Sequence, residues 1–169
     1  MKKIILLVLF IFLAASSVCF ADGFDIGLSG VFASNNQYTL YGGGLNLAGT
    51  IYFGRSIVGI GLFGNIFYVT GDADAILGNA LFGPVFRVVN GKRFALPISV
   101  GFYAGLGGLA FSDDVTISPD IGIGLNITPQ VRLGRRTHFY ARLQSGLDFL
   151  HDFEFDFILS TGIGFSGWR

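Results

Sequence analysis

The chain contains little charge for its length. Charged residues make up 13% of its 169 residues and hydrophobic residues 51%, whereas charged residues make up about 25% of a typical globular protein. A chain with so few charges cannot easily cover the surface of a soluble domain. Its length is that of a single domain.

Long apolar runs are also missing after the first 21 residues. No later segment reaches the roughly 18 apolar residues of a membrane-spanning helix, because the 26 glycines interrupt the apolar residues every few positions. This excludes a helical membrane protein. The glycines follow no period of three, so the chain is not collagen-like either.

The one long apolar run stands at the start and predicts a signal peptide. Lys2 and Lys3 precede twelve apolar residues, 4–15, and the small residue Ala21 follows shortly after. This pattern is typical of a secretory signal peptide. We therefore expect residues 1–21 to be removed and residues 22–169 to form the mature domain.

Cysteine occurs once, at Cys19. We interpret it as a signal-peptide residue that is lost on cleavage. The alternative is a lipidated N-terminal cysteine, against which Val18 counts as a bulky preceding residue. In either case the mature chain contains no disulfide bond.

After residue 21 the apolar residues occupy alternate positions. In 121–128 the odd positions are Ile or Leu, and the even positions are Gly, Asn or Thr. A period of two predicts strands. We expect eight of them, each long enough to cross a bilayer when tilted, at 24–33, 39–53, 57–69, 76–88, 94–110, 120–132, 138–149 and 156–167. Pro84 should mark a β-bulge in the fourth strand.

The connections between these strands divide the charges. Acids lie in or beside the odd-numbered connections at Asp72, Asp74, Asp113, Asp114, Asp120, Asp148, Asp152, Glu154 and Asp156. Bases lie in or beside the short even-numbered ones at Arg55, Arg87, Lys92, Arg93, Arg132, Arg135 and Arg136. Asn90-Gly91 is a strong hairpin-turn signal. One misassigned strand would scramble this separation, so the charges favour an up-and-down arrangement.

The alternation predicts an apolar outer face around a polar inner face. A soluble barrel would need a charged outer face, whereas these strands carry almost no charge between their ends. We therefore predict an all-β fold, a closed antiparallel up-and-down eight-stranded transmembrane β-barrel. Aromatic residues near the strand ends would form two interfacial girdles, or pack inside the barrel: Tyr38, Tyr41, Phe67, Tyr68, Phe111 and Phe149 at the acidic end, and Phe24, Tyr52, Phe53, Phe94, Phe139 and Tyr140 at the basic end.

In this pattern the whole mature region resembles the small outer-membrane barrels of the OmpA transmembrane-domain, OmpX and opacity-protein type, with the OmpW-like barrels as second choice. The resemblance implies location in the cell outer membrane, insertion by the barrel-assembly machinery, and both termini in the periplasm. One departure concerns the last residues. Family members usually end on an aromatic residue that belongs to the assembly signal, whereas this chain ends on Trp168-Arg169.

No motif in the sequence indicates catalysis, so we expect no enzyme, cofactor or dedicated metal site. Residues 59–64 match a dinucleotide-binding fingerprint but lie inside a predicted strand, where no helix follows. His151 beside Asp152 could act as a general base, but no Ser or Cys stands in a recognisable nucleophile motif. The acidic connections have no calcium-loop spacing. Basic residues outside the short turns are too few for nucleic-acid binding.

The inward positions predict a polar network in the lumen. Its expected members are Asn46, Asn65, Asn126, Arg142, Gln144 and Asp148, with Thr50, Thr128 and Ser160 beside them. Eight strands leave room that side chains can fill, and a buried lone charge is costly. We therefore expect a hydrogen-bonded plug in which Arg142 pairs with a carboxylate such as Asp148. The alternative is a narrow passage, because many inward positions are glycine.

Three functions remain open at this point. The first is a structural or surface-interaction barrel in contact with outer-membrane lipid, whose outward acidic loops would meet an external protein. Those loops carry Asp72, Asp74, Asp113, Asp114, Asp152 and Glu154. The second is a small channel or transporter for small, even apolar, solutes. The third and weakest is a barrel-embedded hydrolase that uses His151.

Overall fold

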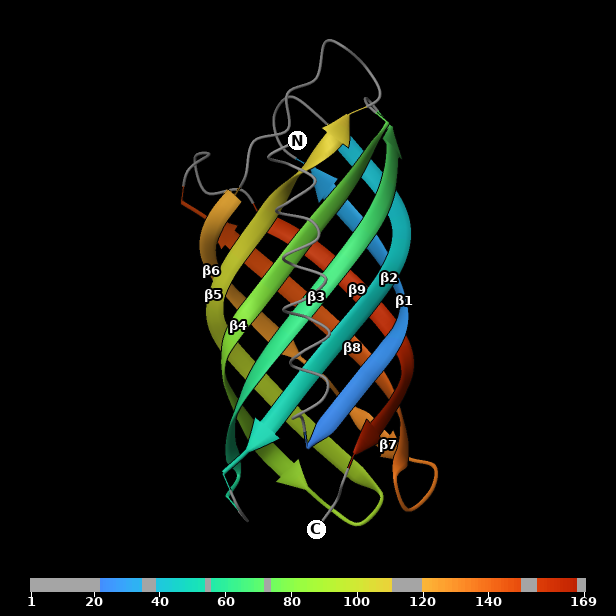
Figure 1. Cartoon of the computed structure of the whole chain (residues 1–169), viewed down its shortest axis with the longest axis vertical. Helices are drawn as coiled ribbons and strands as arrows, with labels where there is room; N and C mark the ends of the chain where they lie inside the picture. The colour runs from blue at the N-terminus through green and yellow to red at the C-terminus, as the bar shows by residue number, and fades with distance from the viewer. Residues whose placement is uncertain are drawn as a thin grey trace.

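In the computed structural model the chain forms a closed β-barrel (Figure 1). The structure describes residues 22–34, 39–53, 56–71, 74–110, 120–149 and 155–166. The expected signal peptide, residues 1–21, lies outside these ranges. Within them, no helix is long and apolar enough to cross a membrane.

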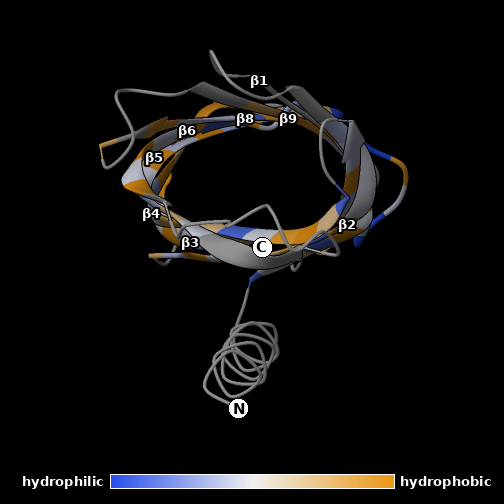
Figure 2. Ribbon diagram, turned by 90° about the horizontal axis from the view of Figure 1, so that it is seen from above, coloured by the Kyte–Doolittle hydropathy of each residue, from blue (hydrophilic) through white to orange (hydrophobic). Residues whose placement is uncertain are grey.

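Antiparallel strands form the whole barrel wall. Their bounds are β1 Gly23–Ser34, β2 Thr39–Tyr52, β3 Val58–Gly71, β4 Ala75–Asn90, β5 Phe94–Ala110, β6 Asp120–Ile127, β7 Gln130–Arg132, β8 Thr137–Asp148 and β9 Phe155–Ser166. Each strand pairs with its neighbours around the ring, where β6 and β7 both pair with β5 and β8, and β1 closes the ring against β9 with Gly23 opposite Ser166. Viewed along the axis, the strands form one continuous ring (Figure 2). This confirms the prediction of an all-β, closed, up-and-down eight-stranded barrel.

The predicted sixth strand, 120–132, is interrupted and appears as β6 and β7. These two strands share one position in the barrel wall, so the nine strands occupy eight positions. β6 ends before Thr128-Pro129 and β7 continues in the same place between β5 and β8. The imide nitrogen of Pro129 cannot donate to the ladder. Backbone hydrogen bonds to β5 and β8 hold the segment between β6 and β7 in the wall, because Thr128 N donates to Pro97 O at 2.9 Å and Ala141 N donates to Pro129 O at 3.1 Å.

The prediction of a bulge at Pro84 is wrong. Pro84 lies opposite Ile60 in a regular register with β3. On the other side the register of β4 with β5 is the same before and after it, with Phe82 opposite Phe102 and Val85 opposite Ser99. Between these two pairs the ladder with β5 is interrupted at residues 83 and 84, although Gly83 still lies beside Gly101. The missing N–H therefore weakens the ladder on one side only. The register shifts lie near both ends of β4, between residues 76 and 78 and between 87 and 89.

Two ends of the barrel are defined by the order of the strands. The loop end holds the connections β1–β2, β3–β4, β5–β6 and β8–β9. The turn end holds the connections β2–β3, β4–β5 and β7–β8, together with the paired residues Gly23 and Ser166. In the sequence, most of the acids lie in or beside the connections of the loop end and most of the bases in or beside those of the turn end, whereas Asp22 and Asp25 are acids of the turn end.

The outer face of the wall is apolar. Leu28 is 66% exposed and Leu159 63% exposed, and the strands alternate between exposed and buried positions. Isoleucine, leucine, valine and phenylalanine line the outside of every long strand. In water such a surface would be strongly unfavourable, whereas hydrocarbon chains solvate it. The exterior is that of a barrel that spans a membrane.

The aromatic residues divide between the two faces. Tyr41, Tyr68 and Phe149 at the loop end, and Phe53, Phe94 and Phe139 at the turn end, are exposed on the outside. Tyr52, Phe67 and Tyr140 are instead buried inside the barrel, so a place in a girdle is wrong for these three. Tyr38 and Phe111 lie outside the described residues.

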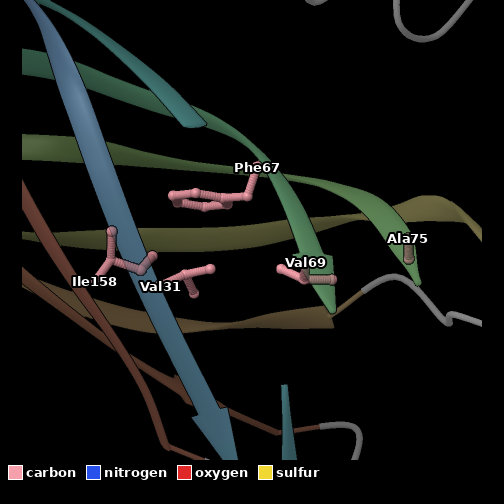
Figure 3. Close-up of a cluster of buried hydrophobic side chains, with 5 residues drawn as sticks. All are labelled: Val31, Phe67, Val69, Ala75 and Ile158. Carbon is pink, nitrogen blue, oxygen red and sulfur yellow. The ribbon is translucent and has the colours of Figure 1, made fainter. Parts of the chain in front are cut away.

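Apolar side chains fill two parts of the interior. Near the loop end, five residues from β1, β3, β4 and β9 form a cluster around Phe67 (Figure 3); they are Val31, Phe67, Val69, Ala75 and Ile158. A second cluster lies along β2, β3 and β4 toward the turn end and consists of Ala48, Tyr52, Phe63, Leu81 and Val85. The polar residues described next occupy the space that these clusters leave.

Candidate functional site

A layer of amides and hydroxyls lies below the cluster around Phe67. On three strands the layer lies two residues closer to the turn end than the cluster does. Ser29 is two residues from Val31, Asn65 two residues from Phe67, and Ser160 two residues from Ile158. The period of two keeps all of these side chains inside the barrel. The layer consists of Ser29, Asn65, Asn79, Gln144 and Ser160, each at most 6% exposed.

Hydrogen bonds connect the amide layer across the barrel. Asn65 Nδ2 donates to Asn79 Oδ1 at 2.8 Å and to Gln144 Oε1 at 3.2 Å. Ser29 Oγ donates to Asn65 Oδ1 at 3.1 Å and lies 3.0 Å from Ser160 Oγ. Gln144 Nε2 donates to Asn79 Oδ1 at 3.4 Å. Asn65 of β3 thus connects Asn79 of β4 with Gln144 of β8 through hydrogen bonds inside the barrel.

The next layer toward the turn end contains the charges. Asp25 of β1 receives two partners from β8: Arg142 Nη2 lies 2.5 Å from Asp25 Oδ2, and His138 Nε2 lies 2.8 Å from Asp25 Oδ1. The side chains of Arg142, His138 and Asp25 are 1%, 2% and 7% exposed. A buried charge is tolerated only when it is paired and hydrogen-bonded. We call Asp25, His138 and Arg142 the ionic cluster.

Arg142 has further contacts that fix its guanidinium. Its Nε donates to Thr128 Oγ1 at 3.3 Å and its Nη1 donates to Asn46 Oδ1 at 3.5 Å. The guanidinium carbon lies 5.0 Å from the ring centroid of Phe63 and 4.8 Å from that of Tyr140. These distances are those of cation–π contacts. The guanidinium therefore lies between carboxylate, hydroxyl, amide and aromatic partners on five different strands or connections.

Two hydrogen bonds extend this arrangement. The Tyr140 hydroxyl donates to Asn46 Oδ1, and Thr128 Oγ1 donates to Asn126 Oδ1 at 2.9 Å. Buried polar groups without a hydrogen-bond partner among the described residues include Asn46 Nδ2, Ser99 Oγ and Asn126 Nδ2. Ser99 and Asn126 lie directly opposite each other in β5 and β6.

Large side chains occupy the space above the inward glycines. A Cβ on Gly164 would lie 2.1 Å from His138 Nε2 and 2.2 Å from Asp25 Oδ1. A Cβ on Gly27 would lie 2.5 Å from the Tyr140 hydroxyl, and one on Gly146 would lie 2.9 Å from the ring of Tyr103. At these positions the glycines make room for large side chains from other strands and do not leave the lumen empty.

Five of the six residues expected in the lumen network lie inside the barrel. Asn46, Asn65, Asn126, Arg142 and Gln144 are each at most 2% exposed. Asp148 ends β8, and its side chain lies outside the described residues. The described carboxylate that pairs with Arg142 is Asp25, where the sequence pointed to one such as Asp148. Whether the network acts as a plug stays a prediction.

Alternation alone could have placed Asp25 inside the barrel. It shares the parity of Ser29 and faces away from Ile26 and Leu28. Asp25 lies within the first strand and not in a connection, so it was not among the acids predicted to face outward. His138 and Tyr140 share the parity of Arg142 in the same way. Which of these inward side chains meet one another depends on the register around the ring.

Most of the acids expected to face outward lie outside the described residues. These are Asp72, Asp113, Asp114, Asp152 and Glu154, together with His151 of the hydrolase hypothesis. Asp74 is described and exposed at the loop end. Residues 59–64 lie within β3 and open no helix, so the dinucleotide-binding interpretation is excluded by its context. Among the described residues, no three of His, Cys, Asp and Glu are grouped as metal ligands.

Solved structures with this fold include three outer-membrane barrels. Neisserial surface protein A (NspA) matches with a TM-score of 0.70 at 8% identity, over 85% of this chain and 96% of that one. Ail, the attachment invasion locus protein of Yersinia pestis, matches with 0.62 at 16%, over 85% and 95%. The N-terminal β-barrel domain of OprF from Pseudomonas aeruginosa matches with 0.51 at 16%, over 86% and 98%. This chain therefore has the fold of the small outer-membrane barrels, as its sequence pattern predicted. No family model and no curated protein sequence matches it.

Proposed function

We propose that the chain is an integral protein of the bacterial outer membrane, with a structural or surface-interaction role and a lumen closed to solutes. The observation that carries this proposal is the filled interior. The amide layer lies next to the cluster around Phe67, and the ionic cluster follows toward the turn end, where Arg142 contacts Phe63 of the second apolar cluster. The apolar exterior fits hydrocarbon on all sides, and the fold of NspA, Ail and OprF supports the same location.

Export completes this proposal. Residues 1–21 would direct the chain across the inner membrane and be removed, and the barrel-assembly machinery would insert the remainder. Asp22 would then be the first residue of the mature protein. In the structure its carboxylate accepts a hydrogen bond from Tyr52 N at 3.0 Å. N-terminal sequencing of protein from outer-membrane fractions should therefore begin at or near Asp22.

Conductance tests the closed lumen. The protein in planar bilayers should give no steady current, whereas Arg142→Ala, which removes the central guanidinium, should give open events. Leu143→Ala is the matched control, because Leu143 is the next residue and faces outward at 44% exposure; it should stay silent. Steady currents from the unmodified protein would contradict the closed lumen.

A small-solute channel is the second candidate, and the unpartnered groups at Asn46, Ser99 and Asn126 favour it. Buried polar groups of this kind commonly hold water, and a line of water is the start of a passage. Flux of small solutes into sealed proteoliposomes would support a channel. Loss of that flux in Asn126→Leu, which removes one such group, would assign it to this lumen.

The partner that the surface-interaction role implies is cationic. Ail has been solved in complex with sucrose octasulfate, a heparin analogue, which is a polyanion. In this chain the acids gather in the connections of the loop end, and a polyanion would be repelled there. Proteoliposomes in which the loop end faces outward should therefore retain poly-lysine and not heparin. Replacement of Asp72, Asp74, Asp113 and Asp114 by asparagine should reduce the retention, and a heparin-retaining wild type would contradict this partner.

A further inference from the structure

Two basic hairpins that are far apart in the sequence lie side by side at the turn end. β5 pairs with β7 through Phe94 opposite Val131, so the β4–β5 turn and the β7–β8 turn become neighbours (Figure 1). Arg132 N donates to Arg93 O at 2.9 Å and joins the two hairpins directly. The turns themselves are closed by Gly91 N to Phe94 O at 2.8 Å and Gly134 N to Thr137 O at 3.0 Å.

Four cations project from these two turns. Lys92 and Arg93 stand in the first, Arg135 and Arg136 in the second, and all four are exposed. Within the described part of the chain, none of the four forms an ion pair. The two described acids of the turn end, Asp22 and Asp25, are occupied by Tyr52 N and by the ionic cluster. The positive field of the hairpins is therefore not neutralised by these acids.

An apolar row lies directly beside the cations on the outer wall. Phe94, Val131 and Phe139 are cross-strand partners on β5, β7 and β8 and are 41%, 46% and 44% exposed. Leu133, which follows β7, is 63% exposed. The cations and the apolar row thus form one continuous amphipathic surface at the edge of the barrel.

We infer that this surface binds an anionic phospholipid of the leaflet that surrounds the turn end. The phosphate and the charged headgroup lie between Lys92 and Arg93 on one side and Arg135 and Arg136 on the other, and the acyl chains lie along Phe94, Val131 and Phe139. Arginine suits this role because its guanidinium binds phosphate oxygens in pairs. A soluble polyanion would use the cations alone, whereas a lipid uses both halves of the surface. The inference rests on the proposed insertion into a membrane.

Spin-labelled lipids provide the test. The protein is reconstituted in phosphatidylcholine vesicles that contain a trace of spin-labelled phosphatidylglycerol or spin-labelled phosphatidylcholine, and the fraction of label immobilised at the protein is compared. We expect phosphatidylglycerol to be preferred. The variant Arg135→Gln/Arg136→Gln should lower its relative association constant about fivefold for each cation that contacts the headgroup, which is about 1 kcal/mol per cation near a charged surface.

Two control variants keep the result specific. Arg135→Lys/Arg136→Lys retains the charge and should retain most of the preference. Asp74→Asn changes one exposed charge at the loop end and should leave the preference unchanged. Equal association of the two lipids with the unmodified protein, or an undiminished preference in the glutamine variant, would overturn the inference. So would loss of the preference on addition of soluble inorganic phosphate at constant ionic strength, since that would assign the cations to a free anion.

Failure of the proposed function is recognised separately. Each preparation is run on a gel before and after boiling, because a closed barrel shifts its mobility on heating. A preparation that never shows the folded band in vesicles would contradict membrane insertion itself. A folded band without lipid preference would contradict only the lipid site.

Discussion

Arg142 of β8 and Asp25 of β1 meet at 2.5 Å inside the barrel, although 117 positions separate them in the sequence. Only one strand, β9, lies between β1 and β8 on that side of the ring. The pair therefore exists only when the barrel has closed through the pairing of β1 with β9. A buried ion pair that depends on closure contributes to the choice of one register, because a slipped strand would leave both charges unpaired.

Breaking this pair should strongly destabilise the barrel. Asp25→Asn leaves the buried Arg142 without its carboxylate, and we expect a loss of about 3–5 kcal/mol. The measurement is urea-induced unfolding from lipid vesicles, followed by gel mobility and circular dichroism. Asp74→Asn, which removes an exposed acid at the loop end, is the control and should change the free energy of unfolding by less than about 0.5 kcal/mol.

The double variant Asp25→Asn/Arg142→Met extends this test. If the two side chains interact mainly with each other, the double variant should lose clearly less than the sum of the two single losses. Additive losses would contradict the pairing of Asp25 with Arg142.

A methyl group at Gly164 should disturb the ionic cluster. The Cβ of Gly164→Ala would lie within 2.2 Å of both His138 Nε2 and Asp25 Oδ1, so one of these side chains must move. We expect a loss of about 1–3 kcal/mol, as for other overpacked interiors. Gly30→Ala is the matched control in a strand, because its Cβ would meet nothing closer than 3.9 Å. Equal effects in the two variants would contradict the close packing at Gly164.

The cost of a charge on the outer wall should depend on its depth in the membrane. Leu159 in the middle of β9 and Leu133 next to the β7–β8 turn are both 63% exposed. Leu159→Arg should cost about 2–4 kcal/mol in lipid and Leu133→Arg about 0–1 kcal/mol. Refolding into vesicles measures both. A soluble barrel would tolerate arginine equally well at the two positions, so equal costs would contradict the membrane-spanning wall.

Phe67 should carry much of the apolar filling near the loop end. It is 1% exposed and packs in the cluster with Val31, Val69, Ala75 and Ile158 (Figure 3). Phe67→Ala should cost about 3–5 kcal/mol, because the cavity cannot collapse in a closed barrel. Phe157→Ala, at an outward position that is 51% exposed, should cost less. The measurement is again urea unfolding from vesicles, and a larger loss at Phe157 would contradict the inward packing of Phe67.

The sequence predicted most of the fold because its signals are local. Alternation of apolar and small or polar residues shows which side chains face lipid, as at 121–128. The separation of acids and bases marks the connections. Both signals depend on the two-residue period of a strand and on the solvent that each face meets. The predicted β-bulge at Pro84 was wrong, because a missing donor weakens a ladder without requiring an extra residue.

The sequence did not predict reliably whether an aromatic residue near a strand end faces inward or outward. Tyr52, Phe67 and Tyr140 were expected in girdles but lie in the interior. A large ring fits both environments. The deciding factor is the space left by glycines on other strands, such as Gly27 and Gly162 around the Tyr140 hydroxyl, and that space depends on the register of the closed ring.

The amino-acid sequence was sufficient to predict an eight-stranded barrel with an apolar exterior, polar side chains in the interior, an acidic end and a basic end, but not the two apolar clusters inside. Each of these properties is set by residues next to one another in the chain. The three-dimensional structure was needed to show that Asp25 and not a connection acid meets Arg142 among the described residues, and that Arg93 and Arg132 join two hairpins. Those contacts require closure and a fixed register around the ring, and no local period in the sequence encodes either of them.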